Sequence, residues 1–112
     1  LGALAALAPS AAEQFAQAMA HRIFTEGGAT AADRLKFALR LTLAKPLEAN
    51  RLAALTELYE GELAHYKKET AAAKDLYGKT VPLPKGADVS EMAALTVVAN
   101  VLLNLDAILM KG

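Results

Sequence analysis

The sequence predicts an all-α fold, an antiparallel bundle of four main helices with a short N-terminal helical segment, forming one domain over residues 1–112. No stretch alternates apolar and polar residues with the period of two that is typical of β-strands. Apolar residues make up 54% of the chain and aromatic residues only 5%, so a core of Ala, Leu, Val and Ile is expected. The predicted connections are short except for one loop, which favours antiparallel neighbours.

The chain opens with a short apolar segment and a capped helix. Leu1–Ala8 predicts a short helical segment, and the tail of a signal peptide is the alternative. Ser10 and Glu13 have the spacing of a capping box, so the first main helix should begin there and end near Glu26, before two glycines. Three apolar residues are expected to face the core: Phe15, Met19 and Ile23.

A second helix is predicted from about Ala31 to Ala44. Thr30 and Asp33 resemble a capping box in which Asp replaces the usual Glu. Pro46 ends the helix, because the residue before a proline avoids the α region. The expected inner stripe contains Leu35, Ala38, Leu39 and Thr42, widened by Phe37, Leu41 and Leu43.

The third predicted helix is long, from about Glu48 to Tyr77. Apolar and aromatic residues repeat along it every seven positions, at Leu52, Tyr59, Tyr66 and Ala73, and Leu55 and Leu63 join this stripe. Its distal part is strongly polar, so we expect it to project beyond the bundle or to pair with something else. Gly61 lowers helix stability by about 1 kcal/mol relative to Ala, which suggests a close backbone contact at that point.

The last helix carries the most information. Residues 79–87 contain two prolines and a glycine, which predict a loop, and Asp88 and Glu91 then have capping-box spacing. From Met92 to Met110 the sequence is apolar almost all round a helix, so this helix should be largely enclosed by the other three. A polar stripe runs along it through Thr96, Asn100 and Asn104, with Asp106 nearby.

The two asparagines of this stripe are each either exposed or buried with hydrogen-bond partners. We expect at least one of Asn100 and Asn104 to be buried, with Arg34 or Arg40 of the second helix as donors. Together with Asp106, these residues are predicted to have a structural role.

Composition excludes several classes of function. The chain has 12 basic and 12 acidic residues, so it lacks the basic excess of a non-specific nucleic-acid binder or of a protein that binds anionic membranes. It has no cysteine, which excludes disulfides, thiolate metal sites and covalent CxxCH haem attachment. No apolar run reaches the ~18 residues typical of a membrane span. We therefore predict no nucleic-acid partner and no membrane span.

The sequence assigns no catalytic residue, cofactor or metal site. Glu62-Leu-Ala-His65 has the spacing of a di-iron carboxylate ligand pair, but a di-iron bundle needs two such motifs. His21 and His65 are the only candidates to ligate a b-type haem, and their charged neighbours indicate boundary or surface positions. Three tyrosines are expected at the edge of the core with hydroxyl groups that reach water: Tyr59, Tyr66 and Tyr77.

Three segments carry a resemblance to one family. They are Leu1-Gly-Ala-Leu-Ala-Ala-Leu7, the stretch DRLKFALRLTLAKP from Asp33 to Pro46, and Ala99-Asn-Val-Leu-Leu-Asn-Leu-Asp106 with the residues that follow to Lys111. In this order they resemble the C-terminal domain of unknown function of the large planctomycete cytochrome-c-type (PSD-type) secreted proteins. The chain departs from the family pattern at Ala8, Ala44, Lys45 and Ala107, where Asn, Gly, Arg and an acidic residue are usual.

The resemblance implies a C-terminal module of a larger periplasmic or secreted protein that normally also has a cytochrome c domain. The leading hypothesis is therefore a non-catalytic interaction module that docks on another domain or subunit of a redox-associated assembly, and homo-oligomerisation is left open. One alternative is a haem- or metal-binding bundle that uses His21, His65 or a methionine. The other is an enzyme whose site forms with another domain, with Arg40, Asn104 and Asp106 as contributors.

Overall fold

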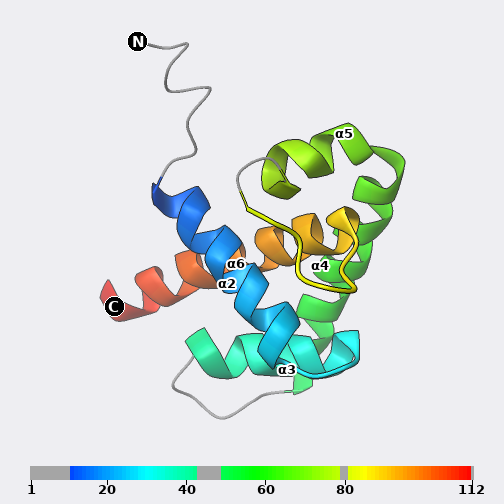
Figure 1. Cartoon of the computed structure of the whole chain (residues 1–112). Helices are drawn as coiled ribbons and strands as arrows, with labels where there is room; N and C mark the ends of the chain where they lie inside the picture. The colour runs from blue at the N-terminus through cyan, green and yellow to red at the C-terminus, as the bar shows by residue number, and fades with distance from the viewer. Residues whose placement is uncertain (1–10, 43–48, 79–80, 112) are drawn as a thin grey trace.

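A computed structural model describes residues 11–42, 49–78 and 81–111 of the chain. Its elements are α2 (Ala11–Glu26), α3 (Ala31–Thr42), α4 (Ala49–Lys68), α5 (Thr70–Ala73), the π-helical turn η1 (Lys74–Gly78) and α6 (Val89–Lys111) (Figure 1). The predicted all-α fold with four main helices is confirmed, and these are α2, α3, α4 and α6. The predictions for Leu1–Ala8, Ser10 and Pro46 concern residues outside the described part of the chain.

Helix α6 lies at the centre of the molecule. It contacts α2, α3, α4, α5 and η1, and Figure 1 shows α2 and α4 on different sides of it. The reason is its sequence, because a helix that is apolar nearly all round needs protein on most sides. Its residues Met92–Thr96, Val98, Ala99 and Leu102 are buried, so the predicted enclosure is confirmed over the part whose side chains are described.

The helix ends follow local capping chemistry. The amide of Asp33 donates to Thr30 Oγ1 at 3.2 Å at the start of α3. The amide of Asp88 donates to Glu91 Oε1 at 3.2 Å at the start of α6. Each bond is one half of a predicted capping box. Helix α2 ends at Glu26 as predicted, and the chain then turns through Gly28, whose φ of 117° favours glycine.

The predicted helix from Glu48 to Tyr77 is interrupted. Helix α4 ends at Lys68, Glu69 has φ −114° and ψ 66°, and α5 then starts in a new direction (Figure 1). The prediction that this distal part projects from the bundle is therefore wrong, since α5 and η1 turn back and pack on α6. Ala73 and Tyr77 become fully buried there, which explains the change of direction.

Gly61 also differs from its prediction. It is exposed on α4, and no atom would lie within 4 Å of a Cβ built at this position. The expected close backbone contact is therefore absent, and this glycine only lowers the stability of the helix.

Candidate functional site

Helix α2 has a buried face and an apolar outer face. The buried face contains Ala16, Gln17, Ala20, Ile23 and Phe24. On the other side, Phe15 is 70% exposed, and it is one of two large hydrophobic side chains exposed in the described part of the chain. We call the exposed residues Ala11, Ala12, Phe15 and Ala18, with half-buried Met19, the outer apolar patch.

The prediction that Phe15 faces the core is wrong, although Ile23 does so and Met19 does so in part. A spacing of four residues placed Phe15, Met19 and Ile23 on one predicted stripe. An α-helix has 3.6 residues per turn, so these three positions drift around the helix. The actual inner stripe is centred on Ala16 and Ala20, which are almost fully buried. Small residues there let α2 approach α6 closely, and this orientation turns Phe15 outward.

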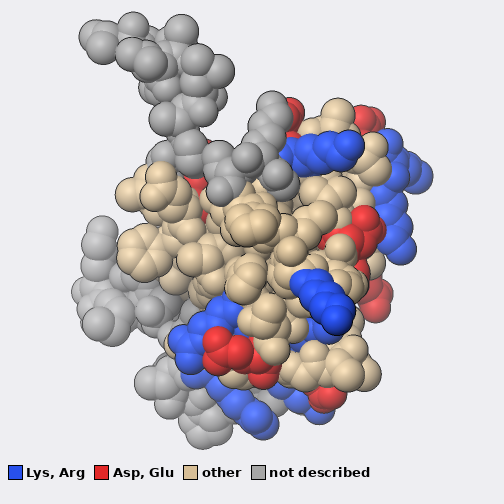
Figure 2. Space-filling model, in the orientation of Figure 1, with Lys and Arg blue, Asp and Glu red and all other residues tan. Residues whose placement is uncertain are grey.

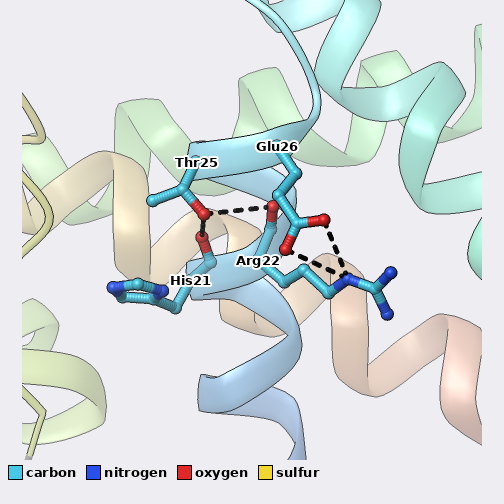
Figure 3. Close-up of polar contacts among 4 residues, drawn as sticks. All are labelled: His21, Arg22, Thr25 and Glu26. Carbon is cyan, nitrogen blue, oxygen red and sulfur yellow. Dashed lines mark hydrogen bonds and ion pairs between the residues drawn. The ribbon is translucent and has the colours of Figure 1, made fainter.

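Polar residues border the outer apolar patch toward the C-terminus of α2. Arg22 Nε lies 3.2 Å from Glu26 Oε2 in an exposed ion pair. Thr25 Oγ1 donates to the carbonyl oxygen of His21 at 2.9 Å (Figure 3). Figure 2 shows most charged side chains along one side and in the lower part of this view, and a largely uncharged area between them with acidic atoms at its upper edge. The patch is therefore uncharged and has a polar border.

Arg34 connects α3 to the end of α2. Its Nε donates to the carbonyl oxygen of Phe24 at 3.3 Å, and its guanidinium carbon lies 3.9 Å from the centre of the Phe24 ring. A cation at the C-terminus of a helix is favourable because the last carbonyl groups there lack helical partners. Arg34 thus holds the turn between α2 and α3, instead of donating to an asparagine of α6.

The asparagines of α6 are not buried. Asn100 and Asn104 are both exposed, so the expectation that at least one lies in the core is wrong. Thr96 is the buried member of the polar stripe, and its hydroxyl donates to the carbonyl oxygen of Met92 at 2.7 Å. Arg40 is exposed on α3, and the side chain of Asp106 lies outside the described residues. The structure therefore places Arg40, Asn100 and Asn104 at the surface.

The two histidines lie on different helices. His21 is half-buried on α2, whereas His65 is exposed on α4, where its ring meets that of Tyr66 edge-on at 4.9 Å between centroids. Both are thus at the boundary or surface, as predicted. Over the described residues, no three His, Cys, Asp or Glu side chains are grouped closely enough to hold a metal ion.

The three tyrosines occupy different environments. Burial raises the pKa of Tyr59, Glu91 and Asp88 raise it further, and Arg34 lowers it. Burial raises the pKa of half-buried Tyr66, with a smaller contribution from Glu62.

Tyr77 departs from its prediction. It is fully buried, and its hydroxyl group has no hydrogen-bond partner, so the expectation that this group reaches water is wrong. Burial raises its pKa.

Two buried polar residues were not predicted from the sequence. Gln17 Nε2 donates to the carbonyl oxygen of Leu76 at 2.7 Å and so connects α2 to η1. Ser90 Oγ donates to the carbonyl oxygen of Tyr66 at 3.1 Å and connects α6 to α4. Neither has a local sequence signal, because each partner is the backbone of a distant element. Both contacts hold the helices together and indicate no reaction.

Comparison with known proteins adds no assignment: no family model matches the chain, and neither curated proteins nor solved structures give a match. Among the described helices, none combines the length and the apolar content that crossing a membrane requires. The outer apolar patch is therefore the candidate functional site, on the basis of its own geometry.

Proposed function

We propose that the chain is a non-catalytic interaction module that docks on another domain or subunit through the outer apolar patch of α2. The observation that carries this proposal is the position of Phe15, which is 70% exposed on the side of α2 opposite its buried face. An aromatic side chain is a typical anchor of a protein interface, since it buries a large area at a small cost in side-chain entropy.

The surroundings of Phe15 fit this role. Ala11 and Ala18 lie on the same outer side of α2, and small residues beside an aromatic side chain leave room for a partner helix. The patch is small, and isolated exposed hydrophobic residues are common on protein surfaces. Such a patch is best suited to a partner that is held nearby, because tethering raises the effective concentration of the second binding site.

The resemblance in sequence supports a particular kind of assembly. It favours a module of an extracytoplasmic protein with a neighbouring cytochrome c domain. The chain has no cysteine and therefore cannot attach haem through CxxCH, so the partner would hold the redox centre. In this proposal the helical domain contributes position and contact to the assembly, and the chemistry belongs to its neighbour.

The test begins with the complete reading frame and the genes beside it, which identify the neighbouring domain or subunit. Its affinity for this chain is then measured by calorimetry for the wild type and for two variants, Phe15→Ser and Leu83→Ser. Leu83 is the matched control, because it is the second large exposed hydrophobic residue (44%) and lies in a loop instead of in α2.

We expect Phe15→Ser to weaken binding roughly tenfold or more, as expected when an interface anchor is removed. Leu83→Ser should bind like the wild type. Both variants should keep the melting temperature, since both side chains are exposed. An unchanged affinity for Phe15→Ser would contradict the proposal.

A further inference from the structure

The break between α4 and α5 has no local cause in the sequence. Residues 65–74 contain neither glycine nor proline, and most of them are good helix formers. Glu69 lies at the N-cap of α5 but makes no side-chain capping hydrogen bond. Local propensity therefore favours a continuous helix through Glu69, as the sequence predicts.

Tertiary contacts hold the break in place. Gln17 of α2 donates to the carbonyl oxygen of Leu76 in η1, and α6 packs on α2 and α4. Ser90, at the start of α6, donates to the carbonyl oxygen of Tyr66. All these contacts join one part of the chain, residues 11–68, to the other, residues 70–111, which we call the C-terminal unit. A second copy of the chain can supply the same contacts.

For a second copy to supply these contacts, only the backbone conformation at Glu69 has to change. With helical backbone angles at Glu69, α4 and α5 form one helix, and the amide groups at the start of α5 gain carbonyl partners in α4. The C-terminal unit then points away from its own α2 and α4. The net charge of zero produces no overall repulsion between two copies.

We propose that the chain forms a dimer by exchange of its C-terminal unit, with Glu69 as the hinge and a second copy of the chain as the partner. Helix α6 of each copy packs on α2 and α4 of the other, and Gln17 binds Leu76 across the two chains. Exchange of identical elements is a low-cost route to a dimer, because the contacts of the monomer are reused. This inference is independent of the outer apolar patch.

The test uses Thr70, the first residue of α5, which is exposed. Thr70→Pro is compatible with the break, since proline suits the first position of a helix, but it prevents a continuous helix. Thr70→Ala is the matched control and favours the continuous helix. The wild type and both variants are refolded from denaturant at high and at low concentration, and their masses are measured by light scattering after size exclusion.

We expect a dimer of the wild type after refolding at high concentration and only monomer for Thr70→Pro. Alanine is favoured over threonine inside a helix, and this gain occurs in each of the two chains of the dimer. Thr70→Ala should therefore raise the dimerisation constant roughly tenfold. A wild type that returns entirely as monomer at high concentration would overturn the proposal. Far-UV circular dichroism of the monomers verifies that Thr70→Pro has kept the helical fold.

A second measurement identifies the kind of dimer. Isotope-labelled and unlabelled chains are refolded together, and filtered nuclear Overhauser spectra report contacts between chains. In the exchanged dimer, the contacts of α2 with α6 are intermolecular. A dimer in which they stay within one chain would be a surface dimer, for example through Phe15, and would also overturn the proposal.

Discussion

At the scale of single residues, the buried hydroxyl group of Tyr77 lowers the stability of the folded protein. It is buried in the contact between η1 and α6 without a hydrogen-bond partner. In the unfolded chain the same group is hydrated, so folding loses the hydrogen bonds to water and gains none. The aromatic ring offsets this cost, because it is fully buried.

Removal of this hydroxyl group should therefore stabilise the protein. We expect Tyr77→Phe to raise the free energy of unfolding by about 1 kcal/mol, measured by urea denaturation, since it keeps the ring and removes the unpaired group. Tyr66→Phe is the control: its side chain is only half-buried, and its effect should stay within about 0.5 kcal/mol. A Tyr77→Phe variant that is less stable than the wild type would show that the hydroxyl group has a partner in solution.

The same variant changes how stability depends on pH. The pKa of Tyr77 is raised above 10.0 in the folded state, so the folded protein holds this proton more tightly than the unfolded chain does. The contribution of this proton to the free energy of unfolding is complete below pH 10 and is lost as the pH rises through the folded-state pKa. Urea titrations from pH 8 to 11 should thus show that the free energy of unfolding of the wild type falls above pH 10. The free energy of unfolding of Tyr77→Phe should fall less steeply. Equal slopes would contradict the burial of this group.

The spacing of apolar residues predicted some buried positions correctly and others wrongly. Ile23, Leu35 and Leu39 lie in the core as predicted. Phe15 was misplaced because alanines fill the inner stripe of α2, and alanine occurs on buried and exposed faces alike. The exposure of Asn100 could not be derived from α6 alone, because it depends on which side of that helix the others leave open. The outer apolar patch was not predicted either, because its exposure depends on which side of α2 the other helices leave open.

At the scale of single elements, two glycines of the chain have opposite roles. Gly28 has φ 117°, and a Cβ there would lie 2.9 Å from Cβ of Asp33. Gly61 lies inside α4 with nothing within 4 Å of a built Cβ. The turn between α2 and α3 therefore depends on a glycine, whereas α4 does not.

Alanine substitutions should separate these roles. Gly28→Ala should lower the free energy of unfolding by about 1–2 kcal/mol, because it combines an unfavourable φ with a close contact. Gly61→Ala should raise it by about 0.5–1 kcal/mol through helix propensity. Thermal and urea denaturation of both variants measures the difference. Loss of stability in Gly61→Ala would indicate a close neighbour of α4 in solution.

Element boundaries were predictable where a local signal sets them. The starts of α3 and α6 and the end of α2 follow from capping residues and glycines close in sequence. The break at Glu69 was not predictable, because no residue near it disfavours a helix. It follows from the burial of Tyr77, a contact that exists only once α6 is in place.

At the scale of the whole molecule, α6 joins all the other described elements. It touches α2, α3, α4, α5 and η1, and its apolar circumference made this central position predictable. The polar contacts of Gln17 and Ser90 add directional links between elements that lie far apart in the sequence. The molecule should therefore unfold as one cooperative unit.

Leu95 allows a direct test of this cooperativity, because it lies on α6 and is 2% exposed. Leu95→Ala should lower the free energy of unfolding by about 2–4 kcal/mol through the cavity that it leaves. Leu83→Ala, at an exposed position, should change it by less than about 0.5 kcal/mol. Since α6 is shared by all parts, the Leu95→Ala transition should coincide when followed by helical circular dichroism and by tyrosine fluorescence. Two separated transitions would show that α4 and η1, which carry the tyrosines, fold apart from the rest of the molecule. Helix α6 would then not unite the domain.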